Sequence, residues 1–213
     1  MAKVFSVDPK NPPPEVIKAA VSVLKSGGVV ALPTETYYGL AVDPFSESAV
    51  QRLFRLKKRP QEKPILLLLG SQEMLAQVVV EIPPWAKRLM EHFWPGPLTL
   101  VFKARRDLPA SLTAGTDTVA VRLSSHPLPT RLSQGFSKPI TGTSANLSGG
   151  SPATSAVEVK RVFPEVDLIL DGGESPGGLP STIVSVAEFP PRLIRAGKIP
   201  WEEIQSLVKQ YAE

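Results

Sequence analysis

A cluster of cationic side chains lies in the stretch RLKKRPQEKP. Lys57, Lys58 and Arg59 occupy one turn, Pro60 follows them, and Lys63 comes shortly before an apolar run. Proline fixes its own backbone angle and disfavours a helix before it, so these cations sit at a rigid turn. Such a group either complements the dipole at a helix end or forms half of an anion site. The choice depends on whether other segments supply the second half.

Three other segments carry small or polar residues directly after an apolar run. LPTETYYGLAVD brings hydroxyls and a carboxylate to the end of a short run, and PITGTSANLSGG has small residues whose backbone N–H groups can approach phosphate closely. DGGESPGGLPSTIVSV is rich in glycine before Ser181, and Arg195 ends the next apolar run. None matches a P-loop or a dinucleotide fingerprint, and each alone also fits an ordinary surface turn.

The stretch TVAVRLSS predicts a strand with one buried face. Val119, Val121 and Leu123 share that face, so Arg122 points to the opposite side. An arginine held on a strand in this way is suited to bidentate binding of a carboxylate.

Apolar runs and helical patterns alternate along the chain with no internal repeat and no long linker. Apolar spacing, glycine stops and capping residues predict helices over 14–26, 47–59, 71–80, 84–93, 127–136, 154–163 and 200–212. Short apolar or alternating runs predict strands over 29–34, 64–69, 98–104, 118–125, 139–144, 166–171, 181–186 and 192–196. This order predicts an α/β fold in a single domain, 1–213, with a twisted mixed parallel/antiparallel open sheet flanked by helices.

The composition of the 213 residues is that of an ordinary globular protein, with 42% hydrophobic and 21% charged residues. The absence of cysteine excludes disulfides, thiolate metal sites and a cysteine nucleophile, and two histidines argue against a histidine-rich metal centre. A net charge of +4 suits an anionic substrate or a weak nucleic-acid contact. We find no signal peptide and no membrane span, and expect a cytoplasmic protein.

Taken together, the polar segments resemble the threonylcarbamoyl-AMP synthase family, the YrdC-like domain. The resemblance covers about residues 14–198 and rests on PTETYYGLAVD, KKRPQEKP with the family's K-x-R element, WPGPLTLVF, VAVRLSSHPL, TSANLSG with its S-x-N element, GLPSTIVSV and RAGKI. The chain ends after one more helix, and so resembles the short, single-domain form. In the longer form a histidine commonly follows the K-x-R element, where this chain has ILLLL, so contacts of that histidine are not transferred and Lys63 is the nearest polar replacement.

The resemblance implies an L-threonylcarbamoyladenylate synthase, a nucleotidyltransferase that is part of tRNA threonylcarbamoyladenosine modification. L-threonine and bicarbonate or CO2 would form a carbamate, whose oxygen attacks the α-phosphate of ATP and releases pyrophosphate. Separate threonylcarbamoyl-transferase enzymes would consume the product. Mg2+ is expected with the ATP phosphates, with no tightly bound cofactor. A concave basic cavity, ATP binding and a possible weak tRNA contact complete the expectation.

The resemblance also implies roles for individual residues. Lys57 and Arg59 are expected to be catalytic through their contacts with the triphosphate. The residues expected to bind ATP are Lys57, Arg59, Lys63, Thr118, Ser144, Asn146 and Arg195. Those expected to bind threonine are Thr34, Thr36, Arg122 and Ser181. No general base stands out, because His126 beside Pro127 is better explained as structural.

Two alternatives remain open at this point. The first is an RNA-binding module that uses a basic concave face, although the chain lacks the aromatic runs that stack on single strands. The second is a carbamoyl-transfer domain like that of hydrogenase maturation proteins, which are much longer and carry regions absent here. Pyrophosphate release that needs threonine, bicarbonate and ATP together separates the synthase from the RNA binder.

Overall fold

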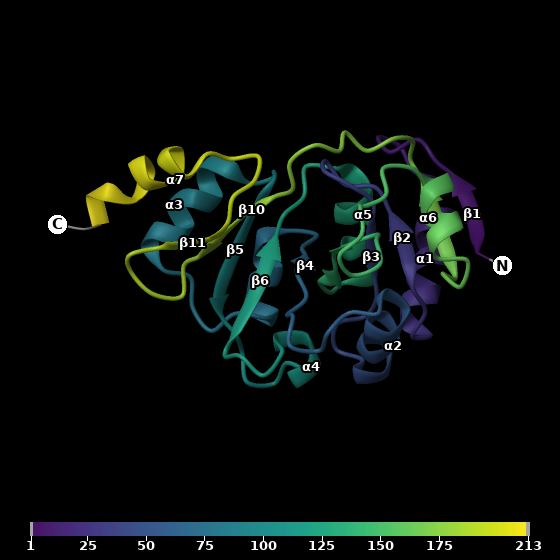
Figure 1. Ribbon diagram of the computed structural model, residues 1–213, viewed down its shortest axis with the longest axis horizontal. Helices are drawn as coiled ribbons and strands as arrows, with labels where there is room; N and C mark the ends of the chain where they lie inside the picture. Colours follow the sequence, from purple (N-terminus) through teal and green to yellow (C-terminus); the bar gives the residue numbers. More distant parts are fainter. Residues whose placement is uncertain (1, 212–213) are drawn as a thin grey trace.

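Two mixed β-sheets form the body of the computed structural model, which describes residues 2–211 (Figure 1). The first sheet contains, in spatial order, β1 (Lys3–Ser6), β9 (Leu168–Asp171), β2 (Val30–Leu32), β3 (Gly39–Ala41) and β8 (Thr143–Ser144). β9 is parallel to both β1 and β2, whereas β3 is antiparallel to β2 and β8.

The second sheet contains β11 (Arg192–Arg195), β10 (Thr182–Ser185), β5 (Leu98–Lys103), β6 (Thr118–Arg122), β4 (Leu67–Leu68) and β7 (Ile140–Thr141). β10 runs parallel to β5 and β4 parallel to β6, and the remaining neighbours are antiparallel. The predicted mixed α/β class is therefore confirmed. The expectation of one sheet is wrong, because the strands are divided between two.

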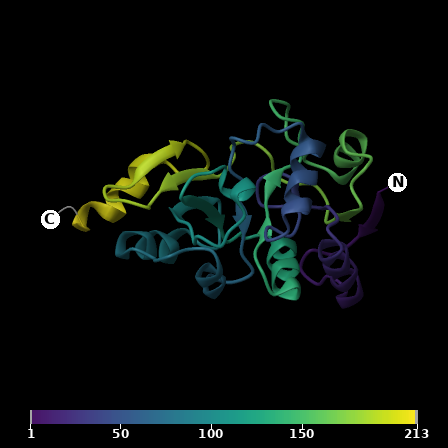
Figure 2. The same cartoon turned by 90° about the horizontal axis from the view of Figure 1, so that it is seen from below.

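Helices cover the outer faces of both sheets. They are α1 (Pro14–Lys25), α2 (Glu47–Lys57), α3 (Pro84–Phe93), α4 (Ala110–Thr113), α5 (Pro127–Phe136), α6 (Ala156–Val162) and α7 (Trp201–Val208), with 3-10 turns at Gln72–Gln77 and Lys209–Tyr211. α1 packs against α5 beside the first sheet, and α3 packs against α7 beside the second. The N-terminal and C-terminal ends of the chain lie at opposite ends of the molecule (Figure 2).

Local signals explain where several helices begin. The Ser46 hydroxyl accepts a hydrogen bond from the Ala49 N–H, so it caps α2 as the sequence predicts. Ser155 caps α6 in the same way through the Glu158 N–H. Proline at the first turn of α1, α3 and α5 supplies a backbone angle that already suits a helix.

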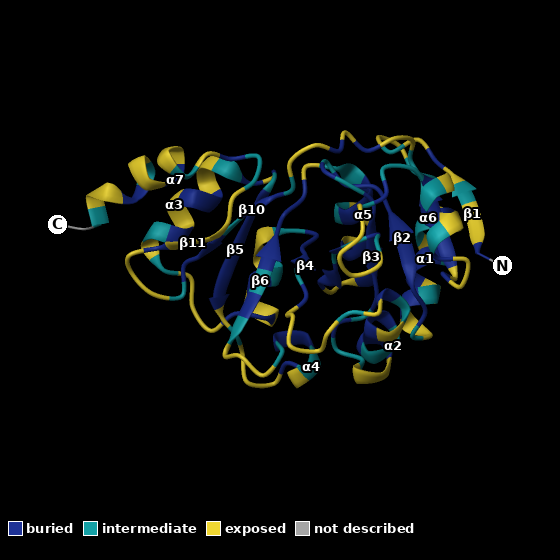
Figure 3. Cartoon of the chain, viewed as in Figure 1, coloured by how far each residue is buried: buried dark blue, intermediate teal, exposed yellow. Residues whose placement is uncertain are grey.

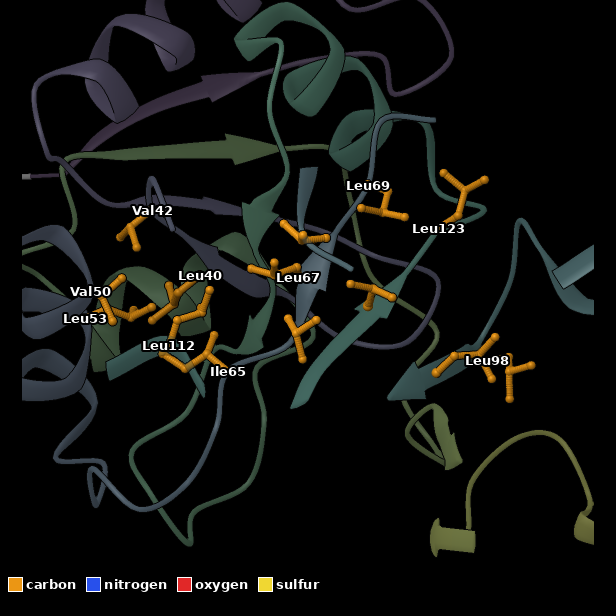
Figure 4. Packing of buried hydrophobic residues seen from close by; sticks show 14 of the residues in the cluster. Leu40, Val42, Val50, Leu53, Ile65, Leu67, Leu69, Leu98, Leu112 and Leu123 are labelled. Atoms are coloured by element: carbon orange, nitrogen blue, oxygen red, sulfur yellow. The ribbon is translucent and has the colours of Figure 1, made fainter. Parts of the chain in front are cut away.

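A continuous apolar core joins the two sheets. The inner strands of both sheets are buried, whereas β1 and β11 at the sheet edges and the outer faces of the helices are exposed (Figure 3). Leu53 on α2 lies near Leu40 on β3 and Ile65, and the same cluster continues through Leu67 to Leu98 on β5 (Figure 4). Because one cluster serves both sheets, their facing edges are held at a fixed distance.

Three predicted segments differ from the structure, and β1, β3 and α4 have no predicted counterpart. The helix predicted over 71–80 is a 3-10 turn, and the strand predicted over 64–69 pairs only at β4. The strand predicted over 139–144 divides at Gly142, where the chain passes from the second sheet to the first. A Cβ at this position would overlap the Leu68 side chain, so glycine permits the close crossing. The last helix is expected to reach residue 212, which lies outside the described residues.

Candidate functional site

A cavity of about 570 Å3 lies between the two sheets. The first sheet and its loops contribute Thr34, Thr36, Tyr37, Tyr38, Gly39, Thr143 and Ser144. The second contributes Val101, Thr118, Ala120, Arg122, Pro180, Ser181, Ile183, Ile194 and Arg195. The cavity is thus built from segments that are distant in the sequence and meet where the sheets face each other.

Three arginines are the charged side chains that line this cavity within residues 2–211. Arg59 lies on the loop after α2, Arg122 ends β6, and Arg195 ends β11. Each comes from a different segment, so their meeting is a result of the tertiary structure. Three guanidinium groups in one cavity form a site suited to anions, with hydroxyls from several threonines and serines around them.

Arg122 is almost completely buried and faces Glu35. Its neighbours Val119 and Val121 lie in the core, while Thr118 and Ala120 line the cavity with it, as the predicted alternation requires. The Nε atom lies 3.5 Å from Glu35 Oε1, and the Ser124 hydroxyl donates a hydrogen bond to Glu35 Oε2. Burial lowers the pKa of Arg122, and the negative charge of Glu35 opposes that change.

Arg195 is oriented by Ser181. Its Nη2 donates to the Ser181 carbonyl oxygen at 2.8 Å and to the Ser181 hydroxyl at 3.0 Å. That hydroxyl also pairs with the buried hydroxyl of Thr99 at 2.9 Å. Burial, and then the nearby positive charge of Arg122, lower the pKa of Arg195. The residue expected to bind ATP therefore contacts a residue expected to bind threonine.

The threonine hydroxyls after β2 form a compact turn. Thr34 Oγ1 donates to the Tyr37 carbonyl oxygen at 2.8 Å and lies 3.0 Å from Thr36 Oγ1. The N–H groups of Thr36 and Tyr37 both donate to Thr34 Oγ1. This turn fixes both threonines in the cavity wall, where the sequence analysis expects them.

Arg59 is held by backbone carbonyl groups of its own loop. Its Nε donates to the Lys63 carbonyl oxygen at 3.2 Å, and its Nη2 donates to that of Pro64 at 2.8 Å. Burial lowers the pKa of this guanidinium. The Lys63 side chain is exposed and is absent from the cavity wall, so the structure does not place Lys63 with Arg59 in the site.

Lys57 also lies outside the cavity wall, which contradicts the expectation that it faces the same cavity as Arg122, Ser144 and Arg195. Its buried ammonium donates to the carbonyl oxygens of Ser144 and Asn146, the latter at 2.7 Å. Burial, followed by the charge of Arg59, lowers the pKa of Lys57 to about 7. Lys57 therefore joins the end of α2 to the loop after β8.

Asn146 organises that same loop and does not line the cavity. Its Nδ2 donates to the carbonyl oxygens of Leu147 and Gly150, at 2.8 and 2.9 Å, and its Oδ1 accepts from the Ser144 hydroxyl at 2.6 Å. Both its polar atoms are therefore engaged within the loop. Ser144 remains in the wall, so the S-x-N element supplies one cavity residue and one loop-forming residue.

Several residues were missed as members of the site. Tyr37 and Tyr38 line the cavity and donate hydrogen bonds to the carbonyl oxygens of Gly178 and Gly173, so they anchor the chain between β9 and β10. Burial, followed by the charge of Asp171, raises the pKa of Tyr38. Glu35 was noted only as a polar neighbour. The sequence signals that could have identified these residues are the two adjacent tyrosine hydroxyls and the single carboxylate that follow a predicted strand.

His126 has a structural role. Its Nδ1 accepts a hydrogen bond from the Leu128 N–H and so caps α5. Burial lowers its pKa, with Glu35 acting in the opposite direction.

Within residues 2–211, no group of three or more histidine, cysteine, aspartate or glutamate side chains is placed to hold a metal ion. No helix in this part of the chain is long and apolar enough to cross a membrane.

Comparison with known proteins gives a consistent result. The sequence model of the Sua5/YciO/YrdC family, described as telomere recombination, matches residues 22–197. The chain is 41% identical to the threonylcarbamoyl-AMP synthase of Pyrococcus abyssi, over 90% of this chain and 57% of that protein. It is 39% identical to the Klebsiella pneumoniae protein of the same name, over 81% of this chain and 92% of that one.

The fold gives the same result. The crystal structure of P. abyssi Sua5 complexed with L-threonine superposes with a TM-score of 0.91 and 38% identity, covering 96% of this chain and 60% of that one. This chain thus spans less than two thirds of the P. abyssi protein and nearly all of the K. pneumoniae protein.

Proposed function

Because the chain belongs to the Sua5/YciO/YrdC family, we propose that it is an L-threonylcarbamoyladenylate synthase. The reaction condenses L-threonine, bicarbonate or CO2, and ATP into threonylcarbamoyl-AMP and pyrophosphate. The observation that carries the proposal is the cavity between the sheets, where Arg59, Arg122 and Arg195 meet among hydroxyl side chains. The single catalytic domain, 1–213, is part of this proposal.

The chemistry needs positioning and charge stabilisation more than covalent catalysis. The threonine amine is carboxylated, one carbamate oxygen attacks the α-phosphorus, and the bond to the pyrophosphate oxygen breaks. Negative charge therefore accumulates around the phosphates and the carbamate during the reaction. Fixed guanidinium groups in a cavity stabilise such charge without having to reorganise.

The two ends of the cavity suit different parts of the substrates. We assign the triphosphate to Arg59, with Thr118 and Ser144 as further contacts. We assign the threonine carboxylate to Arg122, and the rest of the amino acid to Thr34, Thr36 and Ser181. Arg195 donates hydrogen bonds to Ser181, and we assign it to the part of the nucleotide that lies beside the amino acid.

Lys57 and Asn146 take indirect roles in this proposal. Both shape the loop that carries Ser144, Lys57 through the carbonyl groups it binds and Asn146 through its own side chain. They position the triphosphate end and are not assigned a contact with ATP. Lys63 is likewise assigned no ligand.

Mg2+ is proposed as a companion of ATP. The triphosphate itself supplies the oxygen ligands that Mg2+ prefers, with water completing the coordination. The ion would neutralise phosphate charge, while the arginines orient the nucleotide and the leaving pyrophosphate.

The wider context is part of the same proposal. Threonylcarbamoyl-transferase enzymes would take the product onward to tRNA, in the cytoplasm where these substrates occur together. A weak direct contact with tRNA stays a prediction. The comparisons support the synthase, and no observation of this structure favours the RNA-binding module over it.

The test is a measurement of pyrophosphate release. We expect release only when L-threonine, bicarbonate and ATP are all present, and we expect the adenylate to be detected by mass spectrometry. Omission of each substrate in turn is the control. Release that does not depend on threonine, or tight binding of tRNA without any adenylate formation, would contradict the proposal.

A further inference from the structure

Glu35 places a carboxylate beside the buried arginine of a cavity whose proposed ligands are anions. Its side chain keeps 14% of its exposure, and Arg122 keeps 4%. A buried negative charge is costly unless another group compensates it. Glu35 therefore needs a physical explanation that the proposed reaction does not supply.

Two contacts fix Glu35 in place. The Ser124 hydroxyl donates to Glu35 Oε2, and the Ser124 hydroxyl also accepts from the His126 N–H at 3.1 Å. The backbone carbonyl oxygen of Glu35 accepts from Lys198 Nζ at 2.9 Å. Backbone and side chain are thus both anchored, so the carboxylate cannot easily turn away from Arg122.

The contact between Glu35 and Arg122 involves one edge of the guanidinium. Glu35 Oε1 lies 3.5 Å from Arg122 Nε, and within residues 2–211 both atoms are buried without a hydrogen-bond partner. No hydrogen bond in this part of the structure engages the Nη1 and Nη2 groups of Arg122, which lines the cavity. The terminal amino groups are therefore the donors left for a ligand.

We propose that Glu35 is a positioning residue that occupies the Nε edge of Arg122, so that a ligand carboxylate binds end-on through Nη1 and Nη2. A guanidinium can hold a carboxylate through two parallel hydrogen bonds on either edge, and Glu35 removes one of these choices. The inference rests on the proposed function for the identity of the ligand. Ser124 supports this role because it fixes the other carboxylate oxygen.

The charge of Glu35 also reduces the net positive charge at the end of the cavity that contains Arg122. Burial, and then the positive charge of Arg122, lower the pKa of Arg195, so the two guanidinium groups repel each other. One carboxylate beside them offsets part of that positive charge. The reduced positive charge at this end suits a zwitterionic amino acid with one carboxylate better than it suits a triphosphate. This difference would favour a single orientation of the two substrates in the cavity.

The experiment compares three variants in steady-state kinetics. We expect Glu35→Gln to raise the KM for threonine about tenfold, because it removes the negative charge beside Arg122 Nε, with the KM for ATP within about twofold. Ser124→Ala should raise the threonine KM about threefold, since it leaves both charges present. Glu81→Gln, an exposed carboxylate beside Lys103, is the matched control and should change neither constant.

A second measurement uses the ligand-free protein. We expect the Arg122 Nε–H proton in 15N NMR spectra, assigned with Arg122→Lys, to exchange with water at least about tenfold faster in Glu35→Gln. An unchanged threonine KM or unchanged exchange would overturn the inference, and so would equal losses for threonine and ATP. If Glu35→Gln does not fold, Ser124→Ala decides by the same two measurements. A wild-type protein that makes no pyrophosphate from threonine overturns the proposed function, and Nε–H exchange then decides alone whether Glu35 holds Arg122.

Discussion

The two ends of the cavity hold their cations in different ways. At the end near α2, Arg59 donates to backbone carbonyl oxygens, which carry no net charge, and so does Lys57 outside the cavity wall. At the end near β6, Arg122 faces the carboxylate of Glu35. Carbonyl groups orient a cation and leave its charge uncompensated, whereas a carboxylate also neutralises it. The first end therefore suits a polyanion and the second a ligand with a single carboxylate.

Arg195 is expected to bind ATP, yet its contacts lie at the amino-acid end. Its hydrogen bonds to Ser181 tie it to the residues assigned to the amino acid, and Arg122 affects its pKa. A strict separation of nucleotide residues from amino-acid residues is therefore too simple for this cavity. The contrast between the ends is best tested by one variant at each end and one at the contacts of Arg195.

The largest expected effect is that of Arg59→Ala. Loss of one charged donor to the reacting phosphates costs ~2–4 kcal/mol of transition-state stabilisation, by analogy with loss of an oxyanion donor. Pyrophosphate release should fall by roughly 30- to 1,000-fold. Arg55→Ala, which removes an exposed charge from the preceding helix α2, is the control. Full activity in Arg59→Ala would mean that the cationic side chains at 57–59 only complement the dipole at the end of α2.

Lys57→Met tests the uncharged acceptors at the same end. The substitution leaves two buried carbonyl oxygens without their donor, so we expect a loss of about 3 kcal/mol in the free energy of unfolding. Urea denaturation at pH 7 measures this loss. Stability equal to that of the wild type would show that the ammonium is not what joins α2 to the loop.

The pH dependence of the same pair of proteins has a definite sign. Lys57 has a pKa of about 7 in the folded protein and 10.5 as its ordinary value, so above pH 7 the unfolded chain binds more protons at this site. The free energy of unfolding of the wild type, minus that of Lys57→Met, should therefore rise by roughly 2 kcal/mol from pH 7 to pH 9. This difference should stay level below pH 6. A difference that stays level from pH 7 to pH 9 as well would mean that the carbonyl groups hold the pKa of Lys57 above 9.

Arg122→Lys tests the amino-acid end. Lysine cannot reproduce two parallel hydrogen bonds to a carboxylate, so the KM for threonine should rise by roughly 10- to 30-fold and that for ATP by less than threefold. Titration of each substrate with the others saturating makes the measurement, with Arg192→Lys on the exposed strand β11 as control. A selective loss for ATP would place the triphosphate at this end instead.

Thr99→Val tests the contacts of Arg195 and has the smallest expected effect. The substitution keeps the shape of a fully buried side chain and removes the hydroxyl that pairs with Ser181. One neutral hydrogen bond is worth about 1 kcal/mol, so both KM values should rise about fivefold as Arg195 loses its orientation. An effect on only one substrate would assign Arg195 to a single end of the cavity.

The sequence by itself determined most of the longer helices and strands and, for several of them, the side that faces the core. Alternation placed Arg122 opposite Val119 and Val121, and the Ser46 cap located the start of α2. Such patterns depend on near neighbours in the chain, so they are readable without a structure. The motifs also identified Thr34, Ser181 and Arg195 as site residues, because each lies beside or at an end of a strand.

Only the tertiary structure decided how these elements meet. Gly142 marks the crossing that divides the strands between two sheets, and the cavity exists because those sheets face each other. The partners of Lys57 are backbone carbonyl groups, which every residue carries, so no sequence pattern distinguishes them. Glu35 and Arg122 are 87 positions apart in the sequence, and a contact of that range depends on the packing of β6 against the chain after β2.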